Sequence, residues 1–536
     1  MNLKSRKILL CCCLMLWPQL ALADFLCQLG QHLQSTNKEA VIAPEYRTFL
    51  ASMDIIRHPE IPLAAESSLV RGYKPEAVEY PGGFGAGLKD PLIERARELK
   101  VFEDFKPWSD ARSRNVTETE LQRAFERAKA AAARVPENQQ EAEFLKRFLP
   151  EVYELTPNLL SPKGLADAKW RLAGGEPELR QMFRFIEESW NTLLRHQPKD
   201  GQLGSLLPMV YPFFIPAGRF QEGYYWDTYP VVMAMVKTGR LNLAHMQVEN
   251  MFAMVRKFGL VPNGWRQYYL SRSQPPMLSS MTREVYAASL RSSEYNRTEV
   301  LNWLRARAMP ALMAEYQGFW MSKRFNQRTG LNFHSDAINL PRPERHGADN
   351  ELEIGNTYRA TRAGAESGRD FTATLGRDVD HVHGVLLNAV MYKVETDLAF
   401  FARELGDQVT AQRMEQAASN RQQAMNRYLW NAEAGRYENY NFVTGQRISL
   451  NDASNAYALW AGVAENSSGN PQAQRILASL TALERRGGLM SSEVMDSKGQ
   501  WDGAHGWPPD HLVAVLGAER YGFNQFADRL ANKWLD

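Results

Sequence analysis

Two short stretches of this chain gather the side chains that a sugar-binding site requires. The first runs from Gly218 to Tyr229 and the second from Gly499 to Pro509, and each combines aromatic rings and carboxylates with an amide or a guanidinium. Aromatic rings can cover the apolar C–H face of a pyranose, and planar polar groups can hydrogen-bond to two neighbouring hydroxyls. Both stretches are therefore candidates for carbohydrate recognition.

The segments around these stretches have the apolar periodicity of helices. Thr117–Glu120 is a capping box in front of one such segment, and Asn242 is expected to cap a second one that ends at Gly259. An apolar stripe over residues 390–401 predicts a third helix, and the stripe over Met414–Leu429 predicts its antiparallel partner. No alternating block of useful length predicts a strand, so the sequence favours one large helical body.

Long connections between the predicted helices carry much of the polar and aromatic content. The clearest are Pro262–Pro276 and Pro341–Phe371, which are rich in Gly, Pro, Arg and Asn. Long loops in a compact domain are usually functional. Helices that form a scaffold and long loops that carry the candidate site suggest a helical toroid with a pocket at one end. Periodicity alone does not distinguish a toroid from another stack of helices.

The first 23 residues have the features of a secretory signal peptide. A positive segment with Lys4, Arg6 and Lys7 precedes an apolar run over residues 8–16 that is too short to span a bilayer, and Ala21–Ala23 is a small-x-small cleavage site. We expect cleavage after Ala23 and a periplasmic location; the alternative is an uncleaved N-terminal anchor. Cleavage would leave one of the four cysteines, Cys27, and so no intramolecular disulfide.

The charge balance disfavours anionic partners. The chain has 63 Lys plus Arg and 61 Asp plus Glu, so that loss of the three basic residues in the signal segment leaves 60 against 61. Nucleic acids and anionic membranes select a basic face, so neither is expected as a partner of the mature chain. No His or Cys spacing is typical of a metal site, and we expect no metal and no cofactor. A neutral small molecule is the expected ligand, and a monomer the expected state.

From about Phe105 to its C-terminus, the chain resembles the trehalase family of glycoside hydrolases. The two stretches described above match that family's signature segments. Further matches follow in the family's order: Pro262–Gly264, Tyr268–Pro276, Arg342–Glu344, Ala365–Phe371 and Asn388. Several independent motifs in the right order make chance agreement negligible.

The resemblance implies the fold class and the domain organisation. The chain is expected to be all-α, with an (α/α)6 toroid-type barrel over residues 163–536 that follows the signal peptide (1–23) and a helical N-terminal arm (24–162). Family members continue beyond the helix that ends here at Asp536. Because that continuation carries the glutamate assigned as general base and a Gly-rich loop, the barrel is expected to be incomplete at its C-terminus.

The resemblance places the general acid of the reaction at Asp370. Trehalose joins two glucoses through both anomeric carbons, so hydrolysis needs a proton on the bridging oxygen and a water at the opposite face of one anomeric carbon. Because the family inverts configuration, two carboxyls roughly 6.5–9.5 Å apart are needed. On spacing alone, Asp370 would instead be read as a helix N-cap before Phe371.

Other residues are implied to bind the substrate because they fall within matched motifs. They are Arg219, Trp226, Asp227, Asn263, Arg272, Ser273, Gln274, Arg342, Pro343, Glu344 and Gly368. An arginine fork can hold two hydroxyls or pin a carboxylate, although each arginine alone is more often a surface ion-pair partner. Gly368 is expected to let the backbone approach the sugar. We expect the three arginines, Trp226 and Asn263 to converge with Asp370 on one concave site.

One departure from the family pattern bears on the acid. Arg369 stands where the family usually has Trp, and a cation there is expected to favour the ionised form of the neighbouring Asp370. The sequence therefore predicts an inverting trehalase. The alternatives are a non-catalytic or degenerate trehalase-like sugar-binding protein, because the segment with the general base is missing, and a helical-toroid glycosidase acting on another disaccharide. If the chain is active, Asp502 is the first candidate to replace the base.

Overall fold

The computed structural model of this chain describes residues 91–114, 116–155, 177–197, 205–345, 358–467 and 471–535, together with residue 69. The predicted signal segment and its cleavage site lie outside these ranges. Within the described residues, no helix has the length and apolarity needed to cross a bilayer.

Residues 91–155 form a small helical unit with its own apolar core, which we call the arm. Its helices are α4 (Pro91–Glu98), α5 (Lys106–Ser109), α6 (Glu118–Ala132) and α7 (Gln140–Val152). The capping box predicted in front of α6 is confirmed, because Thr117 Oγ1 accepts from the Glu120 amide and the Glu120 carboxylate accepts from the Thr117 amide. Strands β1 (Arg112–Ser113) and β2 (Tyr153–Glu154) pair antiparallel. The boundary predicted at residue 163 lies outside the described ranges and stays a prediction.

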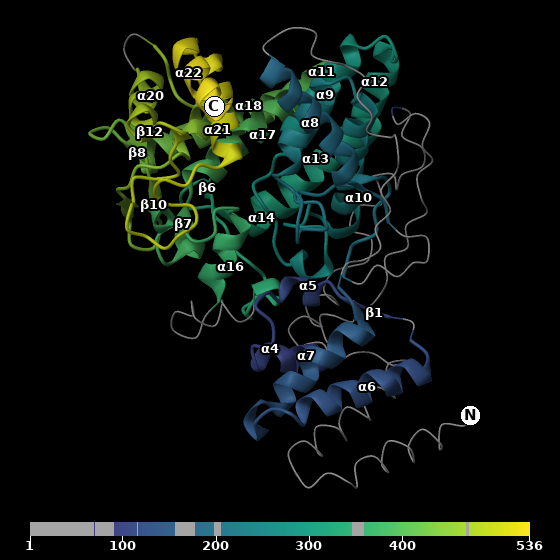
Figure 1. The fold of residues 1–536 in the computed structure, drawn as a ribbon. Coiled ribbons are helices and arrows are strands. Elements are labelled where there is room, and N and C mark those ends of the chain that lie inside the picture. The colour runs from purple at the N-terminus through teal and green to yellow at the C-terminus, as the bar shows by residue number, and fades with distance from the viewer. Residues whose placement is uncertain are drawn as a thin grey trace.

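The larger part of the molecule is built from consecutive helix pairs. Its longer helices are α8 (Pro177–Leu193), α9 (Thr228–Lys237), α10 (Leu241–Phe258), α11 (Leu278–Arg291), α12 (Arg297–Trp303), α13 (Met309–Glu315), α16 (Arg359–Glu366), α17 (Val385–Glu404), α18 (Gln408–Tyr428), α19 (Asn455–Ala461), α20 (Gln472–Leu483), α21 (Pro508–Arg520) and α22 (Asn524–Leu535). Helices α9, α11, α17, α19 and α21 pack side by side in that order, and each packs against the next helix of its pair, α10, α12, α18, α20 or α22. This alternation is the pattern of an α/α toroid (Figure 1).

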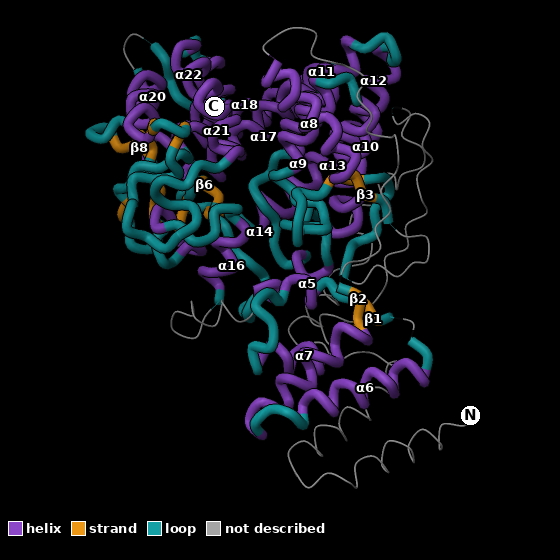
Figure 2. Tube along the Cα trace, in the orientation of Figure 1, coloured by secondary structure: helices purple, strands orange, loops and turns teal. Residues whose placement is uncertain are grey.

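The strands of the described chain are only two or three residues long. Five two-stranded pairs and one three-stranded sheet, β11 (Gln446–Ile448), β10 (Asn439–Asn441) and β7 (Val382–His383), close loops between helices. The expectation of an all-α body without a substantial sheet is therefore confirmed. Loops and short strands gather in the half of the barrel nearer α5 and α16 (Figure 2).

Tertiary contacts, and not the predicted cap at Asn242, determine where helix α10 begins. Helix α10 begins at Leu241 and not after Asn242, so the predicted cap is wrong. The preceding Arg240 is buried and donates to Thr238 Oγ1 and to Glu187 Oε2, both at 2.6 Å, which fixes the chain before the helix starts. The predicted end is confirmed, because Gly259 closes the helix in a left-handed conformation with φ 77°.

The predicted antiparallel pair is also confirmed. Helices α17 and α18 pack along each other, and the turn between them contains Gly406 with φ 78° and Asp407, whose carboxylate accepts from the Thr410 amide at 3.0 Å. The expected loop over residues 341–371 is partly wrong, because it contains α16. Arg362 anchors that helix, since its guanidinium donates to Asp336 Oδ2 at 2.9 Å in the protein interior.

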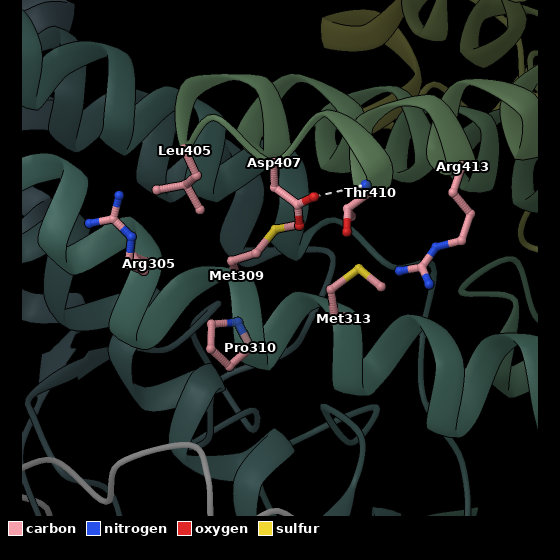
Figure 3. Close-up of a pocket in the computed structure, with 8 residues that line it drawn as sticks. All are labelled: Arg305, Met309, Pro310, Met313, Leu405, Asp407, Thr410 and Arg413. Carbon is pink, nitrogen blue, oxygen red and sulfur yellow. Dashed lines mark hydrogen bonds between the residues drawn. The ribbon is translucent and has the colours of Figure 1, made fainter.

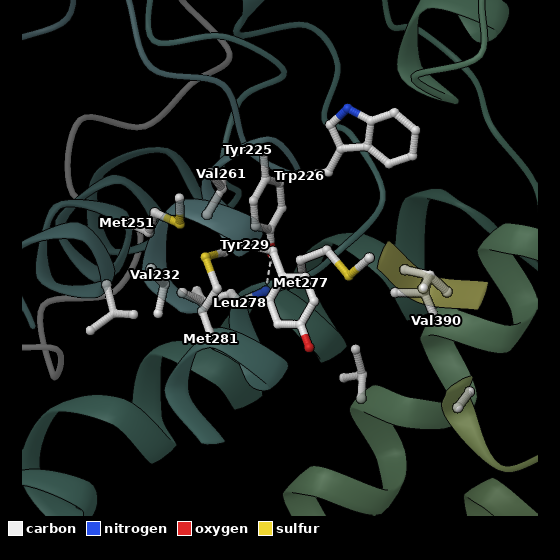
Figure 4. Packing of buried hydrophobic residues seen from close by; sticks show 14 of the residues in the cluster. Tyr225, Trp226, Tyr229, Val232, Met251, Val261, Met277, Leu278, Met281 and Val390 are labelled. Carbon is white, nitrogen blue, oxygen red and sulfur yellow. Dashed lines mark hydrogen bonds between the residues drawn. The ribbon is translucent and has the colours of Figure 1, made fainter. Parts of the chain in front are cut away.

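The apolar core lies where the inner helices meet. Figure 4 shows how the start of α9 packs against α10, α11 and α17, through Tyr225, Trp226, Tyr229, Val232, Met251, Val261, Met277, Leu278, Met281 and Val390. The first predicted stretch, Gly218–Tyr229, thus ends inside this core. Helix packing therefore holds the aromatic residues at the end of this stretch in place without a ligand.

Candidate active site

Asp370 lies in direct contact with Arg342. Its Oδ2 atom is 3.2 Å from Arg342 Nη1, and the contact joins residues on two separate loops. The Asp370 side chain is 24% exposed whereas that of Arg342 is 3% exposed, so the carboxylate is accessible and the guanidinium is fixed behind it. The other carboxylate oxygen accepts from Gln500 Nε2 at 3.4 Å, a contact from the second predicted stretch.

A second buried ion pair lies beside the first. Arg272 Nη2 donates to Glu344 Oε1 at 2.6 Å, and Arg272 Nη1 lies 3.4 Å from Asp336 Oδ2. Burial opposes the charged form of Arg272, but the carboxylates of Glu344 and Asp336 raise its pKa overall. Glu344 is separated from Arg342 by a single residue, so the two ion pairs belong to one cluster.

Two atoms of this cluster lack a hydrogen-bond partner among the described residues. They are Glu344 Oε2 and Arg272 Nε, an acceptor and a donor on two paired side chains. Buried polar atoms are nearly always satisfied by protein or by water, so an exception needs an explanation. A hydroxyl group, which both donates and accepts, would suit either atom.

The turn that carries Asp370 has an unusual backbone. Phe371 adopts φ 67°, a left-handed conformation that side chains other than Gly, Asn and Asp rarely take. Such a residue is retained only where its surroundings fix it, and here the guanidinium of Arg345 lies 4.2 Å from the centre of the Phe371 ring. The reading of Asp370 as a helix N-cap is wrong, because the next helical turn, η7 (Ala373–Leu375), is capped by Thr372.

Residues of the second predicted stretch contact this turn. The Trp501 amide lies 3.4 Å from the carbonyl oxygen of Phe371, and a Cβ atom at Gly499 would lie 2.2 Å from the same oxygen. Only glycine fits at position 499 without moving the turn. Asp502 accepts from Thr372 Oγ1 at 2.8 Å and from the Ala373 amide at 2.8 Å, so its carboxylate holds the residues that follow.

Aromatic residues of the two stretches meet in one wall. The rings of Trp226 and Trp501 lie 5.7 Å apart, and Trp501 stacks on Trp507 at 4.3 Å with an interplanar angle of 13°. Gly368 was expected to let the backbone approach the sugar, but its nearest neighbour is Trp226. A Cβ atom at Gly368 would lie 2.8 Å from Trp226 Cζ2, and Gly368 has φ 72°.

Asp227 follows Trp226 at the start of α9. Its side chain makes no helix-capping hydrogen bond. Burial raises the pKa of Asp227 from 3.8 to about 6, although hydrogen bonds from Trp226 and its own backbone act in the opposite direction. The group therefore changes charge close to neutral pH.

Arg369 does not act on Asp370 as the sequence suggested. Its buried guanidinium donates to Asp510 Oδ2 at 3.1 Å, lies 3.6 Å from Asp452 Oδ2 and faces the ring of Trp501. Two carboxylates thus balance the charge that was expected to favour ionised Asp370. The cation in contact with Asp370 is Arg342.

Three of the predicted substrate residues use polar atoms to join loops. Asn263 Nδ2 donates to the carbonyl oxygens of Ser273 and Ala365, at 3.2 and 3.1 Å. Ser273 Oγ donates to the carbonyl oxygen of Val261 at 2.7 Å, and Gln274 Oε1 accepts from the Trp226 amide at 3.2 Å. These contacts hold the Trp226 and Asp370 segments together, and a direct role in binding stays a prediction.

Arg219 and Pro343 face the arm. Arg219 Nη1 forms a 2.8 Å ion pair with Asp104, and none of the hydrogen bonds or ion pairs among the described residues joins it to Asp370. Its side chain is 43% exposed, which fits the alternative of a surface ion pair. The carbonyl oxygen of Pro343 accepts from Ser109 Oγ at 2.8 Å. A direct contact thus joins Arg342, but not Arg219, to Asp370 among the described residues, and the convergence on one concave site stays a prediction.

Glu366 is a functional candidate that the sequence reasoning passed over. It is buried and accepts from Arg324 Nε at 2.8 Å, and from the amides of Ser273 and Ser335, both at 3.0 Å. Burial would raise the pKa of Glu366, but Arg324 and hydrogen bonding, including that of His334, lower it to about 2. Glu366 lies within the Ala365–Phe371 motif, and this position was the feature of the sequence that could have identified it as a candidate.

The described residues hold no cluster of metal-ligating side chains, but some of them line a groove away from this site. Among them, no group of three or more His, Cys, Asp or Glu side chains is arranged to hold a metal ion. A groove of about 360 Å³ lies outside this site, between α13 and the α17–α18 turn (Figure 3). It is lined by Arg305, Met309, Pro310, Met313, Leu405, Asp407, Thr410 and Arg413, none of which belongs to the predicted site.

The family model and the relatives found by sequence point to one family. A family model described as Trehalase matches residues 100–536. The chain is 32% identical over 379 residues to a periplasmic trehalase of Xanthomonas campestris pv. campestris, covering 65% of this chain and 64% of the relative. It is 30% identical over 384 residues to a probable trehalase of Eremothecium gossypii, covering 63% of this chain and 51% of the relative. The chain thus spans between half and two thirds of the length of these relatives.

A solved structure with a similar fold is the neutral trehalase Nth1 from Saccharomyces cerevisiae. The TM-score is 0.55 at 23% sequence identity, with 83% of this chain and 87% of that chain covered. At this level of identity the likeness concerns the fold alone. It confirms the expected all-α class with an (α/α)6 toroid-type barrel.

Proposed function

This chain belongs to the trehalase family, and we propose that it binds α,α-trehalose and acts in its hydrolysis to two glucose molecules with inversion of configuration. The observation that carries the proposal is the accessible Asp370 carboxylate in contact with the buried Arg342, beside the Trp226–Trp501 wall. A carboxyl group, fixed cations and an aromatic face together suit the cleavage of a glycosidic bond.

In this proposal Asp370 is the general acid. Its proton passes to the oxygen that bridges the two glucoses as the bond from that oxygen to one anomeric carbon breaks, while a water attacks this carbon from the opposite face and gives its proton to a separate general base. Arg342 Nη1 contacts Oδ2 and orients the group, and Oδ1 accepts a long hydrogen bond from Gln500. General acid catalysis depends on such positioning.

The neighbouring ion pair supplies hydroxyl recognition in this proposal. Glu344 Oε2 would accept from a glucose hydroxyl, and Arg272 Nε would donate to one. A site built to bond hydroxyls rejects ligands that lack them, because its buried polar atoms would stay unpaired. Trp226 offers the apolar surface for the ring face.

The base of the reaction is a separate question, for which the sequence suggested Asp502. That carboxylate is buried and already accepts from Thr372, Ala373 and Ser492. A base must be free to take a proton from water, so these contacts argue against Asp502 in that role. We infer that Asp502 holds the acid-bearing turn.

We also infer that the protein is exported to the periplasm as a monomer. The features of residues 1–23 and the similarity to a periplasmic relative support this location. Mass spectrometry of the mature protein should find Asp24 as its first residue. A soluble mature protein that retains Met1 would contradict the inference.

The proposed reaction is tested by the products formed from trehalose, maltose and sucrose. We expect glucose from trehalose alone, and proton NMR at early times should show equal amounts of α- and β-glucose, because inversion changes only one of the two anomeric centres. Two α-anomers would indicate retention. Release from maltose but not from trehalose would indicate another disaccharide.

A further inference from the structure

The short helix α5 of the arm lies at the base of three loops of the candidate site. It runs from Lys106 to Ser109 and is drawn in Figure 1 between the arm and the barrel. One loop contains Glu222, a second contains Arg266 and Tyr268, and the third contains Pro343. Residues 106–110 contact all three loops, although no residue of the arm belongs to the predicted site.

The contacts to the first two loops form a closed network of four charges. Lys106 Nζ lies 2.7 Å from Asp110 Oδ2 and 2.8 Å from Glu222 Oε1. Arg266 Nε lies 2.5 Å from Glu222 Oε2 and 3.1 Å from Asp110 Oδ1. All four side chains are at most 3% exposed, and two positive charges face two negative ones. Loss of one member would leave an uncompensated charge in the interior.

Tyrosines extend this network towards Arg272. Tyr268 donates to Asp110 Oδ1 at 2.7 Å, and Tyr224 donates to Glu222 Oε1 at 2.5 Å. The hydroxyls of Tyr224 and Tyr269 lie 2.8 Å apart, and the guanidinium of Arg272 lies 5.0 Å from the centre of the Tyr269 ring. The arm is thereby connected to the residue that pairs with Glu344.

A hydroxyl of α5 contacts the third loop. Ser109 Oγ donates to the carbonyl oxygen of Pro343 at 2.8 Å, and Arg97 Nη2 donates to the same hydroxyl at 2.7 Å. Pro343 directly follows Arg342, which contacts Asp370. A shift at Ser109 is therefore transmitted to Arg342 through a single residue.

We propose that α5 and Asp110 form a clamp that sets the positions of Arg272 and Arg342 relative to Asp370. Ser109 and Asp110 are positioning residues in this proposal, because they touch the loops of the site and not the sugar. The proposal rests on the proposed function for the identity of the ligand. Its consequence is that sugar binding and docking of the arm stabilise each other.

The test uses trehalose binding to the full chain, measured by calorimetry, and hydrogen exchange of the amides over 263–276 and 341–345. Ser109→Ala removes one hydroxyl and should weaken trehalose binding about five-fold, with faster exchange over 341–345. Ser109→Thr keeps the hydroxyl and should restore both. Asp110→Asn should weaken binding more, and Tyr268→Phe serves in its place if that variant does not fold.

The matched control loosens the arm without touching the clamp. Arg95 pairs with Glu141 and Glu98 inside the arm, so Arg95→Gln should lower the stability of the arm and leave the trehalose affinity unchanged. Equal losses of affinity in Arg95→Gln and Ser109→Ala would overturn the clamp, as would native affinity and native exchange in both Ser109→Ala and Asp110→Asn. If the unmodified chain binds no trehalose, the proposed function fails, and unchanged exchange over the two loops then overturns the clamp independently.

Discussion

Asp370 is fixed by contacts from two separate parts of the chain and by the turn that carries it. Arg342 and Gln500 contact its two oxygens, and the backbone after it takes the left-handed conformation of Phe371. A residue in that conformation costs on the order of 1–3 kcal/mol unless its surroundings compensate. The hydrogen bond from the Trp501 amide to the Phe371 carbonyl and the Arg345 guanidinium over the Phe371 ring supply that compensation.

We predict that Asp227 gives trehalose binding a pH dependence. Its folded pKa of about 6 lies above its ordinary 3.8, so its contribution to stability is present below 3.8 and is lost as the pH rises through 6. Ionised Asp227 accepts a hydroxyl more strongly, and trehalose affinity should rise about five-fold as the pH increases through 6. Calorimetry across this range should show no such rise for Asp227→Asn. The same profile in both proteins would contradict a role for Asp227.

Gly368 and Gly406 form a matched pair of tests for the Trp226 contact. Both have positive φ, but a Cβ atom would lie 2.8 Å from Trp226 Cζ2 at Gly368 and meets nothing within 4 Å at Gly406. Gly406→Ala should cost about 1 kcal/mol of unfolding free energy through backbone strain alone. Gly368→Ala should cost about 2–4 kcal/mol and weaken trehalose binding. Urea unfolding measures both, and equal losses would show that the ring does not constrain this turn.

At the scale of elements, the second predicted stretch acts as a support for the acid-bearing turn. Asp502→Asn keeps one acceptor for Thr372 or Ala373 and should lower stability by about 1–2 kcal/mol, while Asp502→Ala should cost about 3 kcal/mol. Turnover of trehalose should fall by less than about ten-fold in Asp502→Asn, because this residue takes no proton in the proposed reaction. A loss of about 10²–10⁴-fold without a loss of stability would identify Asp502 as the base.

The elements that local rules determine were predictable from sequence. The capping box at Thr117 and the left-handed end at Gly259 depend on neighbouring residues alone, and the structure confirms both. The start of α10 was not predictable, because the buried contact of Arg240 with Glu187 overrides a cap at Asn242. Helix α16 was missed because its anchor, a buried ion pair with Asp336, comes from a distant loop.

The candidate site was predictable as a set of residues but not as a set of contacts. Family motifs indicate Asp370 and Arg342, yet only the fold shows that they touch. The same limit explains Arg369, whose expected effect on Asp370 is cancelled by Asp510 and Asp452. Partners that lie 28 to 141 residues away in sequence cannot be read from spacing.

At the scale of the whole molecule, the interior contains paired charges as well as an apolar core. Arg324 with Glu366, Arg421 with Glu395 and Arg307 with Glu249 are all largely buried. Such pairs need every hydrogen bond satisfied, and breaking one partner is strongly destabilising. The free energy of unfolding should therefore decrease at acidic pH.

Glu366 allows that sensitivity to be measured. Its folded pKa of about 2 lies below its ordinary 4.5, so its contribution is present above 4.5 and is lost as the pH falls through 2. The contribution is on the order of 3 kcal/mol. Glu366→Gln should unfold more readily at pH 7 and show a flatter stability profile between 4.5 and 2. Glu143→Gln, at an exposed pair with Arg147, should leave the profile unchanged; identical profiles for Glu366→Gln and the unmodified protein would contradict the assignment.

The rate of glucose release from trehalose in an Asp370→Asn variant tests the role of Asp370 most directly. Asp496→Asn, at an exposed carboxylate three residues before the second stretch, is the matched control. We expect the control to match the unmodified protein, and Asp370→Asn to lose at least about 10²-fold in kcat while calorimetry finds its trehalose affinity nearly unchanged. A variant that keeps the rate of the unmodified protein would show that another group protonates the bridging oxygen.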